Sequence, residues 1–132
     1  MPRFSLKHLL LGTAIIAAGL AVVLSLKRLI DPFDNEAFTP AAWAKADDEG
    51  RARMSRDLIH NHLRRGLSQG QVEALIGPAF HIQKPGDAWK VVGAEAHVYG
   101  IESFGVFGID DAVVRVHYDA SMKVIEAEIT YD

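Results

Sequence analysis

The chain has 132 residues, with 14 Lys or Arg, 17 Asp or Glu and no cysteine. This length suffices for one domain and an appendage, and the lack of cysteine excludes disulfides, thiolate metal sites and a lipid-modified N-terminal cysteine. Because the formal net charge is −3, the chain lacks the basic surface that binds nucleic acid, and we expect no nucleic-acid partner.

An uncharged apolar run, LLLGTAIIAAGLAVVLSL, occupies residues 9–26. As a helix it would be about 27 Å long, close to the thickness of the bilayer hydrocarbon. The run predicts a membrane anchor over residues 1–28 that contacts the lipid bilayer through residues 9–26. A cleaved signal peptide is the alternative, because Arg3 and Lys7 form a basic region before it. The expected localisation is the membrane, single-pass, with a periplasmic domain, although basic residues on both sides leave the orientation open.

The folded domain is expected at residues 43–132, after a tether. Residues 29–42 contain two prolines and no hydrophobic period, which is typical of a linker. The first helix of the domain is predicted to begin at a cap on Asp47 or Asp48 and to end before Gly66, because apolar residues recur there at helical spacing.

A second, short helix is predicted within GLSQGQVEALIGP, residues 66–78. Ser68 and Gln71 have the spacing of a capping box, in which each residue bonds the backbone N–H of the other. The glycine and proline that follow the apolar face end the helix. The residues of this structural motif are Gly66, Ser68, Gln71, Val72, Leu75, Gly77 and Pro78.

After the second helix the hydrophobic period changes from 3.6 to 2, which predicts strands at residues 97–99, 112–118 and 123–131. The last two are expected to form a hairpin whose register follows from matching apolar faces. The predicted pairs are Tyr118 with Ile125, Val116 with Ala127, Val114 with Ile129, His117 with Glu126 and Arg115 with Glu128.

Together these elements predict an α+β fold. Two helices pack on one face of a three-stranded antiparallel meander, in the order ααβββ, preceded by the transmembrane helix. A sheet this small must cover its apolar face, and the two helices are available to do so. The outer face is then expected to carry Val113, Arg115, His117, Glu126, Glu128 and Thr130.

The motif G-L-S-x-x-Q-V-x-x-L-I-G-P at residues 66–78 resembles that of SmpA/OmlA, a family of small outer-membrane lipoproteins. The resemblance covers roughly residues 50–131 and includes Tyr99-Gly100, Ile109-Asp110 and the hairpin turn from Tyr118 to Val124. Family members assist β-barrel assembly. The resemblance therefore implies a membrane-tethered interaction or scaffold module of the bacterial envelope, linked to envelope or outer-membrane assembly. This chain would be a relative without the lipobox cysteine.

A protein partner is expected to bind at the first strand and the loop after it. The strand is short and is predicted to lie at a sheet edge, where another chain can add a strand. Large apolar side chains on the glycine-rich loop either dock a partner or fill the end of the core. The residues of this candidate surface are His97, Val98, Tyr99, Phe104, Val106 and Phe107.

The sequence contains no recognisable catalytic device, so we expect a protein that is not an enzyme and has no cofactor or metal. His60 and His62 lie about 200° apart around the predicted helix and cannot hold one ion together. The alternative is a small ligand-binding or hydrolase domain that uses Asp110, Asp111 and His117. The simpler interpretation of the two aspartates is a turn at the entry to a strand.

Overall fold

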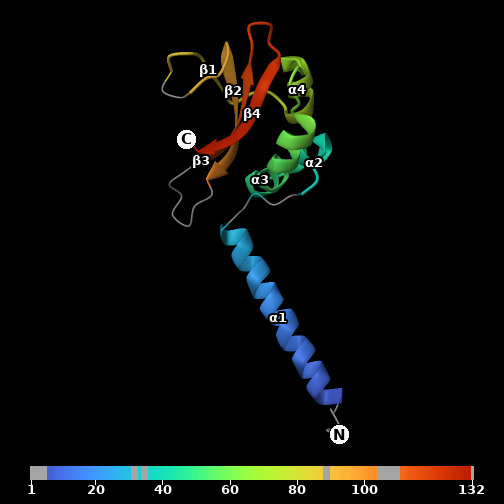
Figure 1. Cartoon of the computed structure of the whole chain (residues 1–132). Helices are drawn as coiled ribbons and strands as arrows, with labels where there is room; N and C mark the ends of the chain where they lie inside the picture. Colours follow the sequence, from blue (N-terminus) through green and yellow to red (C-terminus); the bar gives the residue numbers. More distant parts are fainter. Residues whose placement is uncertain (1–5, 31–32, 34–35, 88–89, 104–110, 132) are drawn as a thin grey trace. The chain divides into compact units, whose positions relative to one another are not determined.

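The structure is a computed structural model that describes residues 6–30, 33, 36–87, 90–103 and 111–131 (Figure 1). The chain divides into two compact units, Met1–Pro32 and Phe33–Asp132. The first unit contains helix α1 (Leu6–Ile30). The second contains helices α2 (Pro40–Lys45), α3 (Asp48–Asp57) and α4 (Gln69–Ile76), the π-helix η1 (Leu58–His62), and strands β1 (His81–Gln83), β2 (Glu95–Ser103), β3 (Asp111–Tyr118) and β4 (Val124–Tyr131).

Helix α1 corrects the expectation of a membrane anchor. Among the described residues, no helix is long and apolar enough to cross a membrane. The predicted transmembrane helix and the single-pass membrane localisation with a periplasmic domain are therefore wrong.

The sheet also differs from the prediction. It has four antiparallel strands in the order β1-β2-β3-β4, not three. The additional strand β1 pairs with β2, with His81 opposite Val98 and Gln83 opposite Ala96. Three residues are too few for an alternating pattern to show in the sequence. The predicted ααβββ arrangement is therefore wrong in its number of strands and helices, although the composition is α+β.

The hairpin of β3 and β4 follows the predicted register over most of its length. Four predicted pairs are confirmed: Val116 with Ala127, Val114 with Ile129, His117 with Glu126 and Arg115 with Glu128. The fifth is wrong, because Tyr118 pairs with Val124 and the register shifts between His117 and Tyr118. Ile125 is the extra residue of this irregularity, which resembles a β-bulge.

Helices α2, α3 and α4 lie on one side of the sheet (Figure 1), and the core lies between them and the sheet. The helical side chains that are buried there include Met54, Leu58, Val72 and Ile76. The sheet contributes Tyr99, Ile101, Ala112, Val114, Val116, Tyr118 and Val124. The predicted capping box of α4 is confirmed, with both reciprocal bonds between Ser68 and Gln71, so the sequence signal for this helix was local and sufficient.

The segment interpreted as a tether contributes to this core. Phe33 and Phe38 of this segment are buried, and the Phe38 ring centroid lies 5.8 Å from that of Trp43, the first residue of the predicted domain. The side chain of Thr39 accepts the Ala42 N–H and caps α2, with Pro40 at the start of the helix. Residues from Phe33 onward therefore belong to the compact second unit.

The helix predicted from Asp47 or Asp48 is shorter than expected and changes its winding. Asp47 caps α3 by accepting the Gly50 N–H at 2.9 Å. After Asp57 the chain forms the π-turn η1, in which the Leu63 N–H donates to the Leu58 carbonyl at 2.9 Å. Because π-winding places more residues in each turn, the helical positions after Asp57 do not follow the 3.6-residue pattern.

Candidate partner-binding site at the β1 edge

The structure buries the predicted partner-binding residues of β2. Strand β2 lies between β1 and β3, so the prediction that residues 97–99 lie at a sheet edge is wrong. His97, Val98 and Tyr99 are buried. Phe104, Val106 and Phe107 lie outside the described residues, as does Asp110. The edges of the sheet are β1 and β4, and the exposed side chains of Phe80 and Ile82 lie at β1.

Two exposed apolar side chains lie at this edge. In the described part of the second unit, three large apolar side chains are exposed: Phe80, Ile82 and Tyr131. Phe80 is 87% exposed and Ile82 is 46% exposed, and both lie on or next to β1. The Phe80 N–H donates to the Val98 carbonyl at 2.8 Å, so its backbone continues the ladder with β2. An edge strand with exposed apolar side chains beside it can accept another strand.

An open pocket lies beside Phe80. Its volume is about 350 Å³, and it is lined by Trp43, Arg51, Ile76, Pro78, Ala79, Phe80, Tyr99 and Gly100. These residues come from α2, α3, the end of α4, the segment after it and β2, so segments distant in sequence form its walls. A concave, mostly apolar pocket with a few polar groups is the usual form of a binding site.

The end of α4 builds one wall of this pocket. Gly77 has a φ of 82°, a conformation that glycine adopts without strain, and Pro78 cannot continue the helix. The chain therefore leaves α4 abruptly and passes through Ala79 and Phe80 into β1. The helix-ending pair that the sequence identified as a structural motif thus also sets the position of the exposed edge.

Arg51 is the charged residue of the pocket lining. Its Nε–H donates to the Trp43 carbonyl at 3.3 Å, and its guanidinium carbon lies 5.7 Å from the centroid of the Trp43 ring. This is cation–π geometry, which holds the planar guanidinium against the indole. Among the described residues no carboxylate forms an ion pair with Arg51. Its terminal amino groups can therefore accommodate an anionic ligand.

The outer face of the sheet is not the open charged surface that the alternating pattern predicted. Arg115 and His117 are only 3% and 1% exposed. The Arg115 Nε–H donates to Gln83 on β1 at 3.0 Å, and the Val92 N–H donates to His117 Nδ1 at 3.1 Å. Strand β1 and the segment after it therefore supply partners to this face, and the charged side chains become interior groups.

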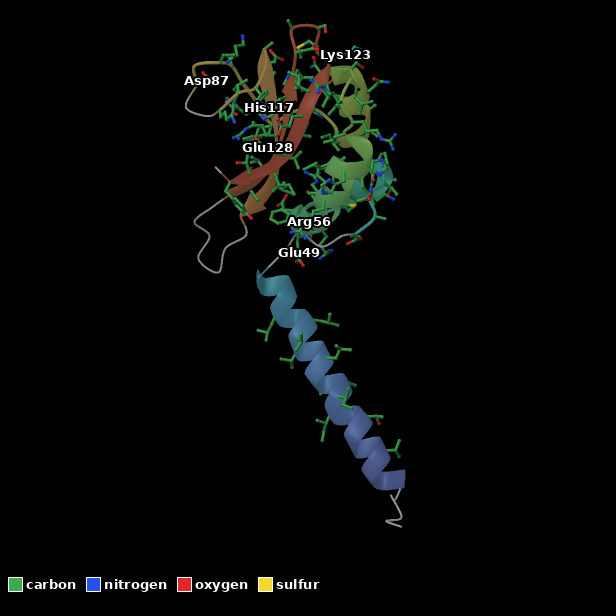
Figure 2. The ribbon with its side chains drawn as sticks, viewed as in Figure 1. Glu49, Arg56, Asp87, His117, Lys123 and Glu128 are labelled. Atoms are coloured by element: carbon green, nitrogen blue, oxygen red, sulfur yellow. The ribbon has the colours of Figure 1, made fainter. Side chains whose placement is uncertain are left out.

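His117 has a partner for each ring nitrogen. Its Nδ1 accepts the Val92 N–H, so its proton is on Nε2, which lies 3.1 Å from a Glu128 carboxylate oxygen. Figure 2 shows these two side chains close together on the sheet. A general base must present a free lone pair to its substrate. His117 does not do so in this arrangement, which disfavours the alternative of a hydrolase that uses this residue.

A second set of buried polar side chains, His97, Tyr99 and Tyr118, lies on the face of the sheet that the helices cover. His97 Nε2 is 2.7 Å from a Glu95 carboxylate oxygen, while His97 Nδ1 and the hydroxyls of Tyr99 and Tyr118 have no hydrogen-bond partner among the described residues. The two hydroxyls influence each other's pKa without forming a well-aligned hydrogen bond. Burial raises the pKa of Tyr99 to about 12 and raises that of Tyr118 further, so both tyrosines are neutral near pH 7.

The histidines do not assemble a metal site in the part of the chain that the structure describes. No group of three or more His, Cys, Asp or Glu side chains there could hold a metal ion. His62 Nε2 instead lies 3.3 Å from an Asp57 carboxylate oxygen, and its ring centroid lies 4.9 Å from that of Phe38. This histidine therefore has a structural role at the end of η1.

Sequence reasoning did not identify Trp43, Arg51, Phe80 or Ile82 as site residues. The signal for the last two was weak: Phe80 and Ile82 alternate with polar residues over only four positions, directly after a helix stop. No protein family, curated protein or solved structure matches the chain.

Proposed function

We propose that residues 33–131 form a protein-interaction module, a scaffold or assembly factor, that binds an extended segment of a partner protein at the β1 edge. The observation that carries this proposal is the 87% exposure of Phe80 at an edge strand. A partner chain that covers this side chain would remove its apolar surface from water, which favours association.

The pocket beside Phe80 supports the same function. Strand addition supplies main-chain hydrogen bonds, and pockets beside the edge supply selectivity for side chains of the added segment. The open pocket of about 350 Å³ combines apolar walls with one arginine, which suits recognition of a peptide side chain or terminus.

The resemblance of residues 66–78 to the SmpA/OmlA motif is consistent with this role. It implies function through protein contacts in envelope assembly. The motif is explained by folding, since its members cap, pack and end α4. The resemblance therefore supports the proposal less strongly than the exposed edge does.

Site-specific photo-crosslinking in cells tests the function. A crosslinking amino acid at position 80 or 82 should give adducts with a discrete protein partner, whereas the same amino acid at position 60 or 64 should not. His60 and Arg64 are exposed, so these controls are equally accessible. Adducts from positions 60 and 64 alone would show that the β1 edge is not the binding surface.

A further inference from the structure

We propose that the pocket beside β1 binds the free C-terminal carboxylate of a partner's extended tail, with Arg51 as the carboxylate-binding residue and the apolar wall receiving the last side chain. This inference rests on the proposed function, because it specifies which segment of a partner protein occupies the β1 edge.

The direction of an added strand favours a C-terminus at the pocket. Pro78, Ala79 and Phe80 line the pocket and immediately precede His81, so the pocket lies at the N-terminal end of β1. A strand that pairs antiparallel with β1, as β2 does on the other side, ends where β1 begins. Its last residue therefore arrives beside the pocket.

The charge of the pocket favours an anion at this end. Residues 37–132 contain 10 Lys or Arg and 14 Asp or Glu, a net charge of 10 − 14 = −4, yet the pocket lining contains one arginine and no acidic residue. A local positive charge on an otherwise acidic domain selects anionic segments and disfavours others.

The geometry of Arg51 suits two parallel hydrogen bonds to a carboxylate. Its Nε–H is already engaged by the Trp43 carbonyl, and the Trp43 ring holds the guanidinium plane. The two terminal amino groups that remain can donate in parallel to the two oxygens of one carboxylate, the bidentate arrangement that arginine prefers.

The apolar part of the lining suits the side chain of the terminal residue. Ile76 and Ala79 lie on one wall, and the aromatic rings of Phe80 and Tyr99 contribute to the others. Burial of an aliphatic or aromatic side chain here would cover Phe80 at the same time. We therefore expect tails that end in Leu, Val or Phe.

Peptide binding to the full-length chain tests this inference. The probes are two acetylated pentapeptide libraries that end in Leu, Val or Phe and differ only in a free carboxylate or an amide at the C-terminus. Fluorescence anisotropy of the labelled peptides should show at least about tenfold tighter binding of the free acids, the loss expected when one charge-assisted pair is removed.

Variants then assign the preference to Arg51. Arg51→Gln should lower the affinity for the free acids about tenfold and leave that for the amides unchanged. Arg64→Gln is the matched control, because the Arg64 Nε–H also donates to a backbone carbonyl, that of Asn61 at 3.2 Å, but outside the pocket. It should bind as the unaltered chain does. Arg51→Lys keeps the charge and should lose less affinity than Arg51→Gln.

Three outcomes would overturn the inference. Equal binding of acids and amides, or no binding of either library, would exclude a terminal carboxylate as the ligand. An equal loss of affinity for the acids and the amides in Arg51→Gln, with the variant folded by circular dichroism, would show that Arg51 does not bind the carboxylate. Crosslinks from positions 80 and 82 would in each case leave the proposed function standing, whereas their absence would remove that function itself.

Discussion

The two edges of the sheet differ in how they are protected. At β4, the first edge residue is covered: the Gly66 N–H donates to the Val124 carbonyl and the Val124 N–H donates to the Leu67 carbonyl, both at 2.8 Å. Glu126 and Glu128 follow on the same strand. At β1 there is no acidic residue, and the apolar side chains of Phe80 and Ile82 are exposed.

This contrast indicates that β1 is the edge available to a partner. Charged side chains on an edge strand discourage the addition of another chain, and a covering segment removes the unpaired backbone groups. Strand β4 carries two glutamates and is covered at Val124, although Tyr131 near its end is exposed, whereas β1 has neither protection and is only three residues long. An unprotected edge favours aggregation unless a specific partner occupies it, so the comparison of the edges supports the assignment of β1 as a binding surface.

The largest expected effect on the free energy of unfolding is in the segment that joins β1 to β2 and so holds the open edge. Gly93 has a φ of 90°, and a Cβ there would collide with the Tyr118 carbonyl and the Ile125 side chain. Gly93→Ala should therefore lower the free energy of unfolding by about 3 kcal/mol, through strain and overpacking. Gly86 also has a positive φ but open space around it, so Gly86→Ala should cost only about 1 kcal/mol. Urea denaturation measures both, and equal losses would contradict the close approach at Gly93.

The next effect concerns Tyr99, whose ring lines the pocket beside β1. Its pKa is raised to about 12 by burial, so the folded state favours the neutral phenol. The contribution of the neutral Tyr99 to the free energy of unfolding is fully present below pH 10. It is lost as the pH rises through about 12, by up to roughly 2–3 kcal/mol. Tyr99→Phe should remove this part of the alkaline loss, as measured by denaturation between pH 9 and 12. An unchanged pH profile would show that the hydroxyl is not buried.

A smaller effect is expected at the protected edge. Ser68 caps α4 and forms an isolated bridge with Lys123, next to β4. Ser68→Ala should lower the free energy of unfolding by about 1 kcal/mol, because the Gln71 N–H loses its side-chain acceptor and retains only the Ser68 carbonyl. Thermal and urea melts provide the measurement, with the exposed Ser121→Ala as the control. A loss of free energy of unfolding as large as that of Gly93→Ala would mean that the cap also keeps the start of β4 in place.

The smallest effect on stability is expected at the open edge. Phe80→Ala should change the free energy of unfolding by less than about 0.5 kcal/mol, because the ring is exposed. The same variant should abolish partner adducts from a crosslinker at position 82. Glu126→Ala on β4 is the matched control and should preserve them. Retention of the adducts in Phe80→Ala, or their loss in Glu126→Ala, would reverse the assignment of the two edges.

The sequence by itself determined the features that depend on neighbours along the chain. The Ser68–Gln71 capping box and a cap at Asp47 or Asp48 join residues three positions apart or fewer, so a local pattern contains the whole interaction. The four confirmed hairpin pairs join consecutive strands, each of which shows its own alternating pattern. For the same reason the sequence marked the abrupt end of α4 at Gly77, without showing that this turn leads the chain into an edge strand.

Only the tertiary structure decided which surface is open. Strand β1 is three residues long and is held by pairing with β2, so its existence depends on residues more than ten positions away. The burial of Arg115 and His117 depends on Gln83 and Val92, and the pocket unites Trp43 and Arg51 with Phe80 and Tyr99. Alternation along one strand cannot reveal these long-range contacts, because it reports which residues share a face and not what covers that face.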